Sequence, residues 1–217
     1  MLRFDEFAVA LGGRTLVRLD GTVAAGKVLA VMGPSGAGKS SLLKAVAGLI
    51  GPPFVVSGRV LVGEEDITRL PVEARGVGLM FQDALLFPHM SVVGNVMFAV
   101  PRRVARSRGA RREVAMGHLG RVAMAHLAEA DPATLSGGER SRVALARTLA
   151  GAPRVLLLDE PFAALDQALK ARTRDIVFRL AAEDGLPVVM VSHDPADAEA
   201  ARAQVVEIRP CQEGEGS

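Results

Sequence analysis

The stretch GPSGAGKSS, residues 33–41, decides the fold of this chain. It matches the pattern G-x-x-x-x-G-K-[ST], follows the apolar run KVLAVM at residues 27–32, and leads into a helical pattern at residues 38–50. In that context the pattern binds phosphate, because the backbone N–H groups of the turn surround the anion. Lys39 would add a positive charge, and the Ser40 hydroxyl would be a ligand for Mg²⁺. We therefore predict a nucleotide-phosphate site formed by Gly33, Pro34, Ser35, Gly36, Ala37, Gly38, Lys39, Ser40 and Ser41.

Apolar strand patterns alternate with helical patterns over most of the chain. In residues 3–11 apolar and polar residues alternate loosely, as in a strand with one face exposed to solvent. Short apolar runs lie at residues 27–32, 55–63, 76–81, 154–159 and 187–192, and helical patterns lie at residues 38–50, 166–184 and 194–202. Because such alternation is typical of a parallel sheet with helices on both faces, we predict an α/β fold with a mainly parallel sheet.

Residues 83–149 differ from the rest of the chain, since they are mostly helical in pattern and rich in Ala, Arg and Met. We interpret them as a helical subdomain inserted into a single α/β domain. The core of that domain would consist of residues 1–82 and 150–210. The polar tail, residues 211–217, is expected to be loose.

The composition excludes several classes of protein. Hydrophobic residues make up 49% of the 217 residues and the net charge is only +2, which indicates a globular chain without a strong basic excess. With no Trp or Tyr there are few aromatic platforms for bases, so no nucleic-acid partner is expected. The single Cys211 cannot form a disulfide within the chain. No apolar run approaches about 18 residues and no signal-peptide pattern is seen, so we expect a cytoplasmic protein that meets a membrane only through a partner.

The run VLLLDE, residues 155–160, ends a predicted buried strand with two acids. Beside a phosphate-binding loop, Asp159 would orient Mg²⁺ or its waters, and Glu160 would polarise an attacking water. The alternative is that both acids cap the next segment or are merely solvated.

The stretch TLSGGERSRVALAR, residues 134–147, begins a predicted helix. Ser136 and Glu139 have the spacing of a capping box, which is an ordinary way to start a helix. The same helix start is also a ready anion site. One γ-phosphate needs only the N–H groups of its own loop. A second anion site at Ser136, Gly137 and Gly138 is therefore explained if it binds a nucleotide held by another copy of the chain.

Five motifs occur in this order along the chain, and the likeness that they carry extends over about residues 4–209: GPSGAGKSS, FQDALLFPHMSVVGNV, LSGGERSRVALAR, LLLDEPFAALD and VSHD. Together they closely resemble the ATP-binding subunit of an ABC transporter. The resemblance implies a P-loop NTPase with a RecA-like core, antiparallel N-terminal strands and an inserted helical subdomain. It also implies a head-to-tail dimer that binds two molecules of ATP with Mg²⁺. Each nucleotide would lie between the loop of one copy and Ser136, Gly137 and Gly138 of the other.

The resemblance assigns roles to three more positions. Gln82 matches a glutamine whose loop senses Mg²⁺ and the water and faces the membrane partner. Asp166 matches a loop that crosses the dimer interface and helps to bind nucleotide, and His193 matches a switch histidine near the γ-phosphate. The implied catalytic residues are Glu160, His193 and Gln82, and the implied metal ligands are Ser40, Gln82 and Asp159. A lone histidine is otherwise most often structural, and we keep that interpretation for His89, His118 and His126.

The segment DEPFAALD and the lack of a membrane-spanning run look like importers in which the ATPase is a separate chain. The implied partners are a second copy of the chain, an integral membrane permease and, through the permease, an extracytoplasmic solute-binding protein. The ATPase would then be peripheral on the inner face of the membrane. The motif FQDALLFPHMSV is similar to small importers for thiamine-like or other small organic solutes. The alternative is a soluble ABC-type ATPase that acts in assembly or regulation without transport.

Leu11 departs from the family pattern, since the family usually has an aromatic residue there that stacks on adenine. Such a stack is worth about 1–3 kcal/mol. We therefore expect weak affinity and poor base selectivity, unless Phe4 or Phe7 substitutes for the missing ring.

Three other features differ from the family or lie outside its motifs. Glu139 replaces the usual glutamine, and it should point back to its own helix start as capping requires. Ala164 replaces a common serine, to which we attach no consequence. The basic run PRRVARSRGARR, residues 101–112, is either a solvated face or a contact with a membrane surface or a partner's acidic loop.

Overall fold

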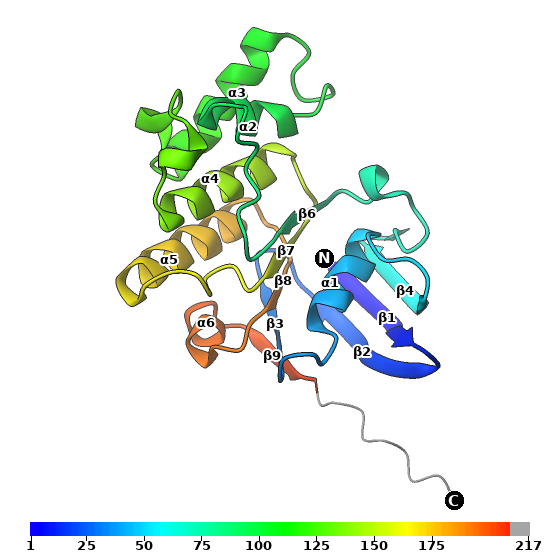
Figure 1. Cartoon of the computed structure of the whole chain (residues 1–217). Helices are drawn as coiled ribbons and strands as arrows, with labels where there is room; N and C mark the ends of the chain where they lie inside the picture. Colours follow the sequence, from blue (N-terminus) through cyan, green and yellow to red (C-terminus); the bar gives the residue numbers. More distant parts are fainter. Residues whose placement is uncertain (209–217) are drawn as a thin grey trace, which may run out of the picture.

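The computed structural model describes residues 1–208 and contains two sheets (Figure 1). One sheet consists of β1 (Leu2–Leu11), β2 (Arg14–Val23), β4 (Phe54–Val62) and β5 (Glu65–Asp66), and it is antiparallel in the order β2-β1-β4-β5. The other consists of β3 (Val28–Met32), β6 (Val77–Met80), β7 (Val155–Asp159), β8 (Val188–Val191) and β9 (Gln204–Glu207). Its order is β6-β7-β8-β3-β9, and all neighbouring strands are parallel. The mainly parallel sheet and the antiparallel N-terminal strands agree with the prediction.

Six α-helices accompany the sheets. They are α1 (Lys39–Ala47), α2 (Val92–Ala99), α3 (Arg108–Arg121), α4 (Gly137–Ala150), α5 (Gln167–Glu183) and α6 (Pro195–Ala200), and short 3₁₀ turns lie at Val72–Ala74, Ala125–Leu127 and Pro132–Thr134. Between β6 and β7 the chain forms only helices and turns, and α2 and α3 project away from the parallel sheet (Figure 1). None of the helices in residues 1–208 is long and apolar enough to cross a lipid bilayer.

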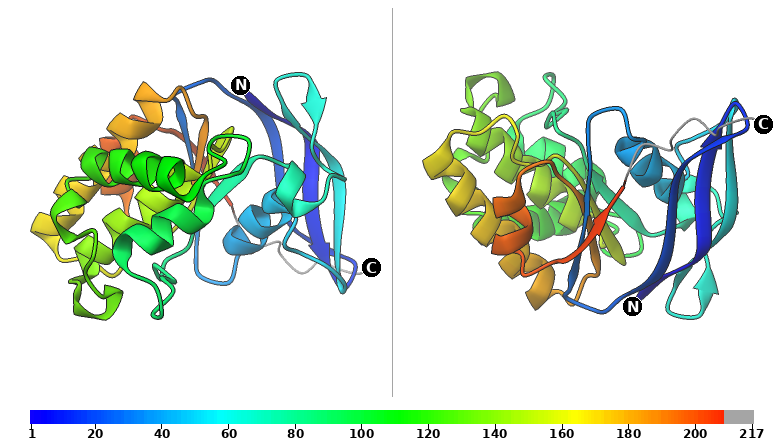
Figure 2. Two further views of the ribbon diagram at one scale, coloured as in Figure 1. Left: turned by 90° about the horizontal axis from the view of Figure 1, so that it is seen from above. Right: turned by 90° about the horizontal axis from the view of Figure 1, so that it is seen from below.

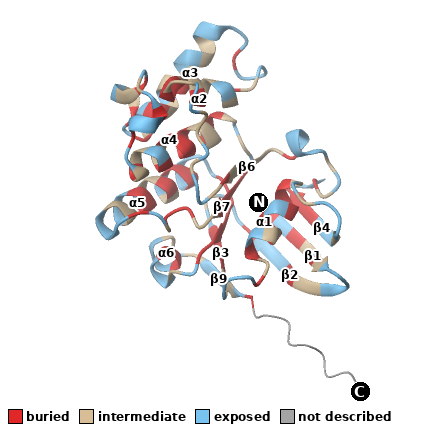
Figure 3. Cartoon of the chain, in the orientation of Figure 1, coloured by how far each residue is buried: buried red, intermediate tan, exposed pale blue. Residues whose placement is uncertain are grey.

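The three central parallel strands, β3, β7 and β8, are buried on both faces because they separate two hydrophobic cores (Figure 3). Along β7, Leu156 and Leu158 face the core shared with α4 and α5, whereas Val155 and Leu157 face the core shared with α1 and the antiparallel sheet. Helix α1 therefore lies between the two sheets, as the views from above and below show (Figure 2). This arrangement fixes the N-terminus of α1 next to the C-terminal ends of β3 and β7.

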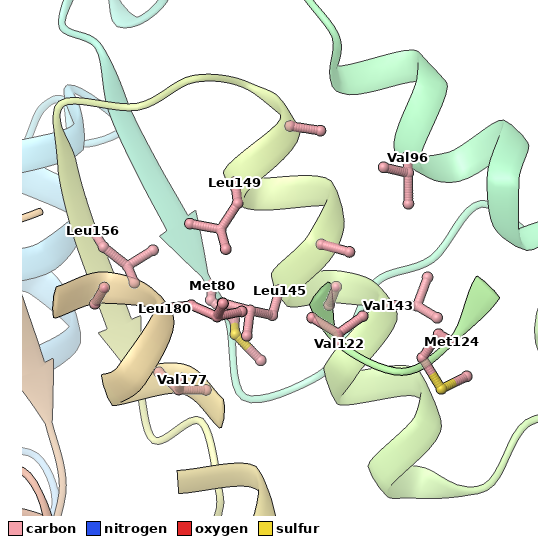
Figure 4. Close-up of a cluster of buried hydrophobic side chains, with 14 of the residues drawn as sticks. Met80, Val96, Val122, Met124, Val143, Leu145, Leu149, Leu156, Val177 and Leu180 are labelled. Atoms are coloured by element: carbon pink, nitrogen blue, oxygen red, sulfur yellow. The ribbon is translucent and has the colours of Figure 1, made fainter. Parts of the chain in front are cut away.

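Helix α4 joins the helical segment to the sheet. Leu145 and Leu149 point toward Met80 of β6 and Leu156 of β7, and Val143 lies toward Val122 and Met124, which follow α3 (Figure 4). Because one helix packs against both groups of residues, a displacement of the helical segment would be transmitted through α4.

Helix α1 ends three residues earlier than the sequence pattern predicts. Gly48 follows it with φ +79°, and its N–H donates to the carbonyls of the last turn. A glycine adopts this left-handed conformation readily, which stops the helix. Leu49, which falls within the predicted helical pattern at residues 38–50, is therefore outside the helix and exposed.

Parts of the basic run at residues 101–112 have a structural role. Arg111 donates to the carbonyl of Met97 at 2.7 Å, and Arg103 reaches the carbonyl of Gly151 at 3.5 Å. Arg112 pairs with Glu129 on the surface. These contacts hold the run against its own helical segment, and the contact with a membrane or a partner stays a prediction for the remaining exposed arginines.

Candidate functional site

The phosphate-binding loop lies between β3 and α1, where the sequence predicts it. Gly33 has φ +152°, and a Cβ there would be 2.4 Å from the carbonyl oxygen of Ile208, so only glycine fits. Gly38 has φ +86° and precedes α1, whose first turn has no side-chain cap and no acidic residue. The free N–H groups at this helix start therefore point to an anion site.

Lys39 is almost completely buried and lies across its own loop. Its Nζ donates to the carbonyl oxygens of Gly33 and Pro34, each at 2.8 Å. An ammonium needs such partners when it is removed from water. The positive charge is thus held inside the turn by carbonyl oxygens of the loop itself.

Asp159 is the last residue of β7 and Glu160 follows it, and both lie beside this loop. The Ser40 hydroxyl donates to Oδ1 of Asp159 at 2.9 Å, across 119 residues of sequence. Burial is the main cause that raises the pKa of Asp159, and neighbouring Glu160 raises it further, whereas the hydrogen bond from Ser40 and the charges of Lys44 and Lys39 oppose the rise. The structure therefore brings together the residues that the sequence proposes for Mg²⁺ and for water activation, apart from Gln82.

The hydroxyl of Ser40 and the carboxylate of Asp159 are suitable ligands for Mg²⁺. Both are hard oxygen donors, which this ion prefers. No cluster of three or more His, Cys, Asp or Glu side chains in residues 1–208 could hold a metal by itself. Phosphate oxygens and water would complete the coordination, as is usual for Mg²⁺ at nucleotide sites.

His193 lies beside Glu160. Its Nδ1 is 3.2 Å from Oε2 of Glu160, and the imidazole is mostly exposed. The residues on either side are fixed by hydrogen bonds: the Ser192 hydroxyl donates to Asp197, and the N–H of Asp194 donates to the Ser192 hydroxyl at 3.0 Å. The histidine therefore sits on a tethered loop, with its side chain free to meet a ligand.

A buried arginine completes this tether. Arg174 of α5 donates to Asp197 and, at 2.8 Å, to Asp194, and its guanidinium lies 5.8 Å from the centre of the Phe162 ring. Lys170 adds a second, longer contact to Asp194 at 3.5 Å. Burial raises the pKa of Asp194, but the N–H of Ala196 and the two cations outweigh it and lower the pKa overall. No sequence motif predicts this cluster, because its members come from two helices and a loop.

A hollow of about 370 Å³ opens at the loop, within the usual size range of small-molecule sites. It is lined by Glu160 and by residues of the loop and the start of α1, namely Ser35, Gly36, Gly38, Lys39, Ser40 and Ser41. The rest of the lining is apolar and consists of Leu11, Leu16 and Phe54. Phe54 was missed in the sequence, because nothing local indicates that β4 pairs with β1 at this point.

The idea that Phe4 or Phe7 substitutes for an aromatic residue at Leu11 is wrong. The two rings are at most 2% exposed and pack against each other with centroids 5.9 Å apart. They belong to the core between α1 and the antiparallel sheet, so neither can touch a nucleotide.

Several predicted site residues lie away from this hollow. Gln82 is exposed on the loop after β6, and Asp166 is exposed at the start of α5, where its carboxylate accepts from the N–H of Leu169 at 3.0 Å. Ser136, Gly137 and Gly138 begin α4, and like Gln82 and Asp166 they are not among the residues lining the hollow.

The start of α4 has the predicted capping box. The N–H and the hydroxyl of Ser136 both donate to Oε2 of Glu139 at 2.8 Å, and the N–H of Glu139 donates back to Ser136. The backbone hydrogen bond from Ser136 and then its hydroxyl lower the pKa of Glu139. The prediction that Glu139 points back to its own helix start is confirmed, and the Ser136 hydroxyl is occupied within the same turn.

Residues 16–163 match the ABC transporter family. The thiamine import ATP-binding protein ThiQ of Cereibacter sphaeroides is 46% identical over 198 residues, which are 91% of this chain and 84% of that protein. The maltose/maltodextrin import ATP-binding protein MalK of Salmonella typhimurium is 41% identical over 177 residues, 80% of this chain and 46% of that protein.

The same likeness extends to a solved structure. The ATP-binding cassette MJ0796, in a dimeric post-hydrolysis state bound to ADP and Pi, matches with a TM-score of 0.78 and 28% identity, covering 96% of this chain and 94% of that chain. The phosphate-binding loop, the acidic pair and the tethered histidine thus occur in a chain that belongs to the ABC transporter family, with the P-loop NTPase fold and the ATPase activity of its ATP-binding subunits.

Proposed function

We propose that this chain is the ATP-hydrolysing subunit of an importer, which works as a head-to-tail dimer and drives a separate membrane permease. The observation that carries the proposal is the hydrogen bond of 2.9 Å from Ser40 to Asp159, beside Lys39, Glu160 and His193. Two relatives named as import ATP-binding proteins support the direction of transport.

Hydrolysis would be driven mainly by positioning and charge. Lys39 and the N–H groups at the start of α1 hold the β- and γ-phosphates, and Mg²⁺, held by Ser40 and Asp159, would neutralise their charge when bound. Glu160 orients the attacking water and takes its proton, while His193 contacts the γ-phosphate. Attack on the γ-phosphorus breaks its bond to ADP and releases phosphate.

The position of Ser136 supports a dimer. The phosphate-binding hollow is lined by residues of β1, β2, β4, the loop and the start of α1, together with Glu160, and the helix start at Ser136 is outside it. A second copy in head-to-tail orientation would bring its own Ser136, Gly137 and Gly138 to the γ-phosphate and its Asp166 to the interface. In this arrangement each nucleotide site is completed by the other copy.

Glu160→Gln tests the ATPase site and the dimer together. We expect turnover to fall by about 10²–10⁴-fold, the usual contribution of a general base, while ATP binding is kept. With excess Mg-ATP the variant should double in mass in solution, because closed sites are no longer emptied by hydrolysis. Lys39→Ala in the same background is the matched control, and it should lose both binding and dimerisation. A Glu160→Gln variant that stays monomeric at saturating ATP contradicts the proposal.

An apolar groove supports the permease contact. It lies beside the Gln82 loop and is lined mainly by residues of β6, that loop, α2 and α4, including Phe81, Leu85, Phe87 and Phe98. Phe98 is 59% exposed and meets the Phe87 ring edge-on at 5.0 Å. Exposed apolar surface of this kind marks a protein interface.

The groove is also connected to the site through α4. Arg147 of α4 donates to the carbonyls of Ala84 and Leu85 at 2.8 Å and lies 5.7 Å from the centre of the Phe87 ring. The Gln82 loop is therefore fastened to the helix that begins at Ser136. Closure of the dimer would move α4 and, with it, a permease segment seated in the groove.

Copurification from membranes tests the permease. A hydrophobic membrane protein should come with the chain, Phe98→Glu should release it, and Val72→Glu, at an exposed apolar residue outside the groove, should not. Because Phe98 is outside the nucleotide hollow, the ATPase of the isolated Phe98→Glu variant should be unchanged. Recovery of the unmodified chain free of any membrane protein would favour an ATPase of assembly or regulation. If the permease is found, uptake of a thiamine-like solute, with its extracytoplasmic binding protein, is the first transport to assay.

A further inference from the structure

The lining of the nucleotide hollow combines two kinds of chemistry. The loop offers N–H groups and Lys39 for phosphates. Three other described residues of the lining are Leu11, Leu16 and Phe54, and none of these side chains has a polar atom. A group that binds against these three side chains can be held by apolar contact and by stacking, and they offer it no hydrogen bond.

Leu11 and Phe54 are direct partners in the antiparallel sheet, at the last pair between β1 and β4. Paired residues project their side chains from the same face of a sheet. Both side chains therefore reach the hollow together, while Val55 and Ala10, the next pair, alternate to the opposite face. Phe54 is the aromatic residue of this lining set.

Phe54 is also held in place. It is half-buried and packs with its inner side against the core of α1 and the antiparallel sheet, and its N–H donates to the carbonyl of Gly51 at 3.1 Å. Leu16 lies against the loop, since a Cβ on Gly38 would be 2.9 Å from the Cβ of Leu16. The apolar part of the lining is therefore continuous with the phosphate-binding loop, and Phe54 contributes to the hollow while it packs against the core.

We propose that Phe54 is the residue on which the nucleobase stacks, and that the site selects nucleotides by this stack instead of by hydrogen bonds to the base. The inference rests on the proposed ATP site and names its specificity-determining residue. Phe54 supplies from β4 the aromatic face that Leu11 does not supply from β1. Adenine and guanine nucleotides should then bind with similar affinity, and pyrimidine nucleotides, with a smaller ring system, more weakly.

Calorimetry should compare the affinity for Mg-ATP with the affinity for Mg-tripolyphosphate, because the second ligand has the phosphates without the base. Phe54→Leu keeps apolar packing and removes the aromatic face. It should lower the affinity for ATP by about 5- to 150-fold, the range for one base–aromatic stack. The affinity for tripolyphosphate should be unchanged. Phe54→Trp should restore ATP binding, and Val55→Ala, at an exposed residue of the opposite face, should behave as the unmodified chain. The thermal midpoint of each variant reports whether the fold is intact.

The outcomes are distinct. Loss of ATP binding in Phe54→Leu with tripolyphosphate kept, and recovery in Phe54→Trp, support the proposal. Unchanged ATP affinity in Phe54→Leu overturns it, as does an equal loss for both ligands, which would show a structural role for the ring. If the unmodified chain binds neither ligand, the proposed nucleotide site itself fails.

Discussion

Replacing Arg174 with methionine should destabilise the folded chain by about 3–5 kcal/mol, the usual cost of removing one partner from a buried ion pair. Arg174 and Asp197 are 9% and 3% exposed, and they are held together within the hydrogen-bond network that includes Ser192. Methionine preserves much of the arginine stem and its packing, so the lost charge dominates the effect. Asp197 would keep only the Ser192 hydroxyl, whereas the more exposed Asp194 would keep Lys170 and water.

For a chain of this length, each kcal/mol lowers the thermal midpoint by about 2–4 °C. The midpoint of Arg174→Met should therefore fall by about 6–20 °C, and urea unfolding should give the matching change in free energy. Asp197→Asn removes the other charge. The double variant should be more stable than the sum of the two single changes predicts, with a coupling of about 0.5–3 kcal/mol, because no uncompensated charge remains at Asp197.

The same change should reach the active site. Ser192 and Asp194 flank His193, so loss of the tether should lower kcat for ATP more than it raises KM. Arg174→Lys, which keeps the charge, should recover part of the activity. A single Arg174→Met variant within about 0.5 kcal/mol of the unmodified chain, the usual effect of a surface substitution, would refute the reasoning, and so would strict additivity in the double variant.

Three other perturbations follow from the structure. Gly138→Ala would place a methyl group 2.3 Å from Cδ2 of Leu169, and overpacking of this kind should cost about 1–3 kcal/mol in urea unfolding, with recovery in the double variant carrying Leu169→Ala. Glu139→Gln should keep the capping box, in which the Glu139 side chain accepts from Ser136. It should strengthen ATP-dependent dimerisation, measured by light scattering, because it removes a negative charge from the helix start that is proposed to meet the partner's phosphates. Burial, followed by the charge of Arg121, lowers the pKa of His118 from its ordinary value of 6.5. The unfolded chain therefore takes up the proton first, so stability should fall as the pH drops below about 6.5, and His118→Asn should flatten that decline in urea titrations at a series of pH values.

The buried parallel strands could be predicted from the sequence, because burial on both faces produces the continuous apolar runs of β7 and β8. Strands β2 and β9 were not found by the same test. Half of β2 is exposed, and β9 is an edge strand in which Val205 faces solvent. Their place in the sheets is determined by pairing with distant strands, which leaves little trace in the local pattern.

The phosphate-binding loop is one continuous run of residues, and the acids Asp159 and Glu160 are neighbours in another. The chemistry of each could therefore be predicted from a local motif. The position of the rings could not. Phe4 and Phe7, three residues apart, would face opposite sides of a regular strand, but the β1–β4 and β1–β2 registers shift between them and both face the core. The contact of Phe54 with the hollow depends in the same way on a register between segments 43 residues apart (54 − 11).

Glu160 has φ +46°, a left-handed backbone that costs a residue with a side chain about 1–2 kcal/mol relative to glycine. Glycine at 160 should thus relax the backbone while it deletes the carboxylate that we propose to activate water. A laboratory search for heat-resistant variants that scores only survival of the fold would be drawn to this substitution and would collect inert proteins. Stability and turnover compete for the same position, and a screen for hardier variants has to reward both.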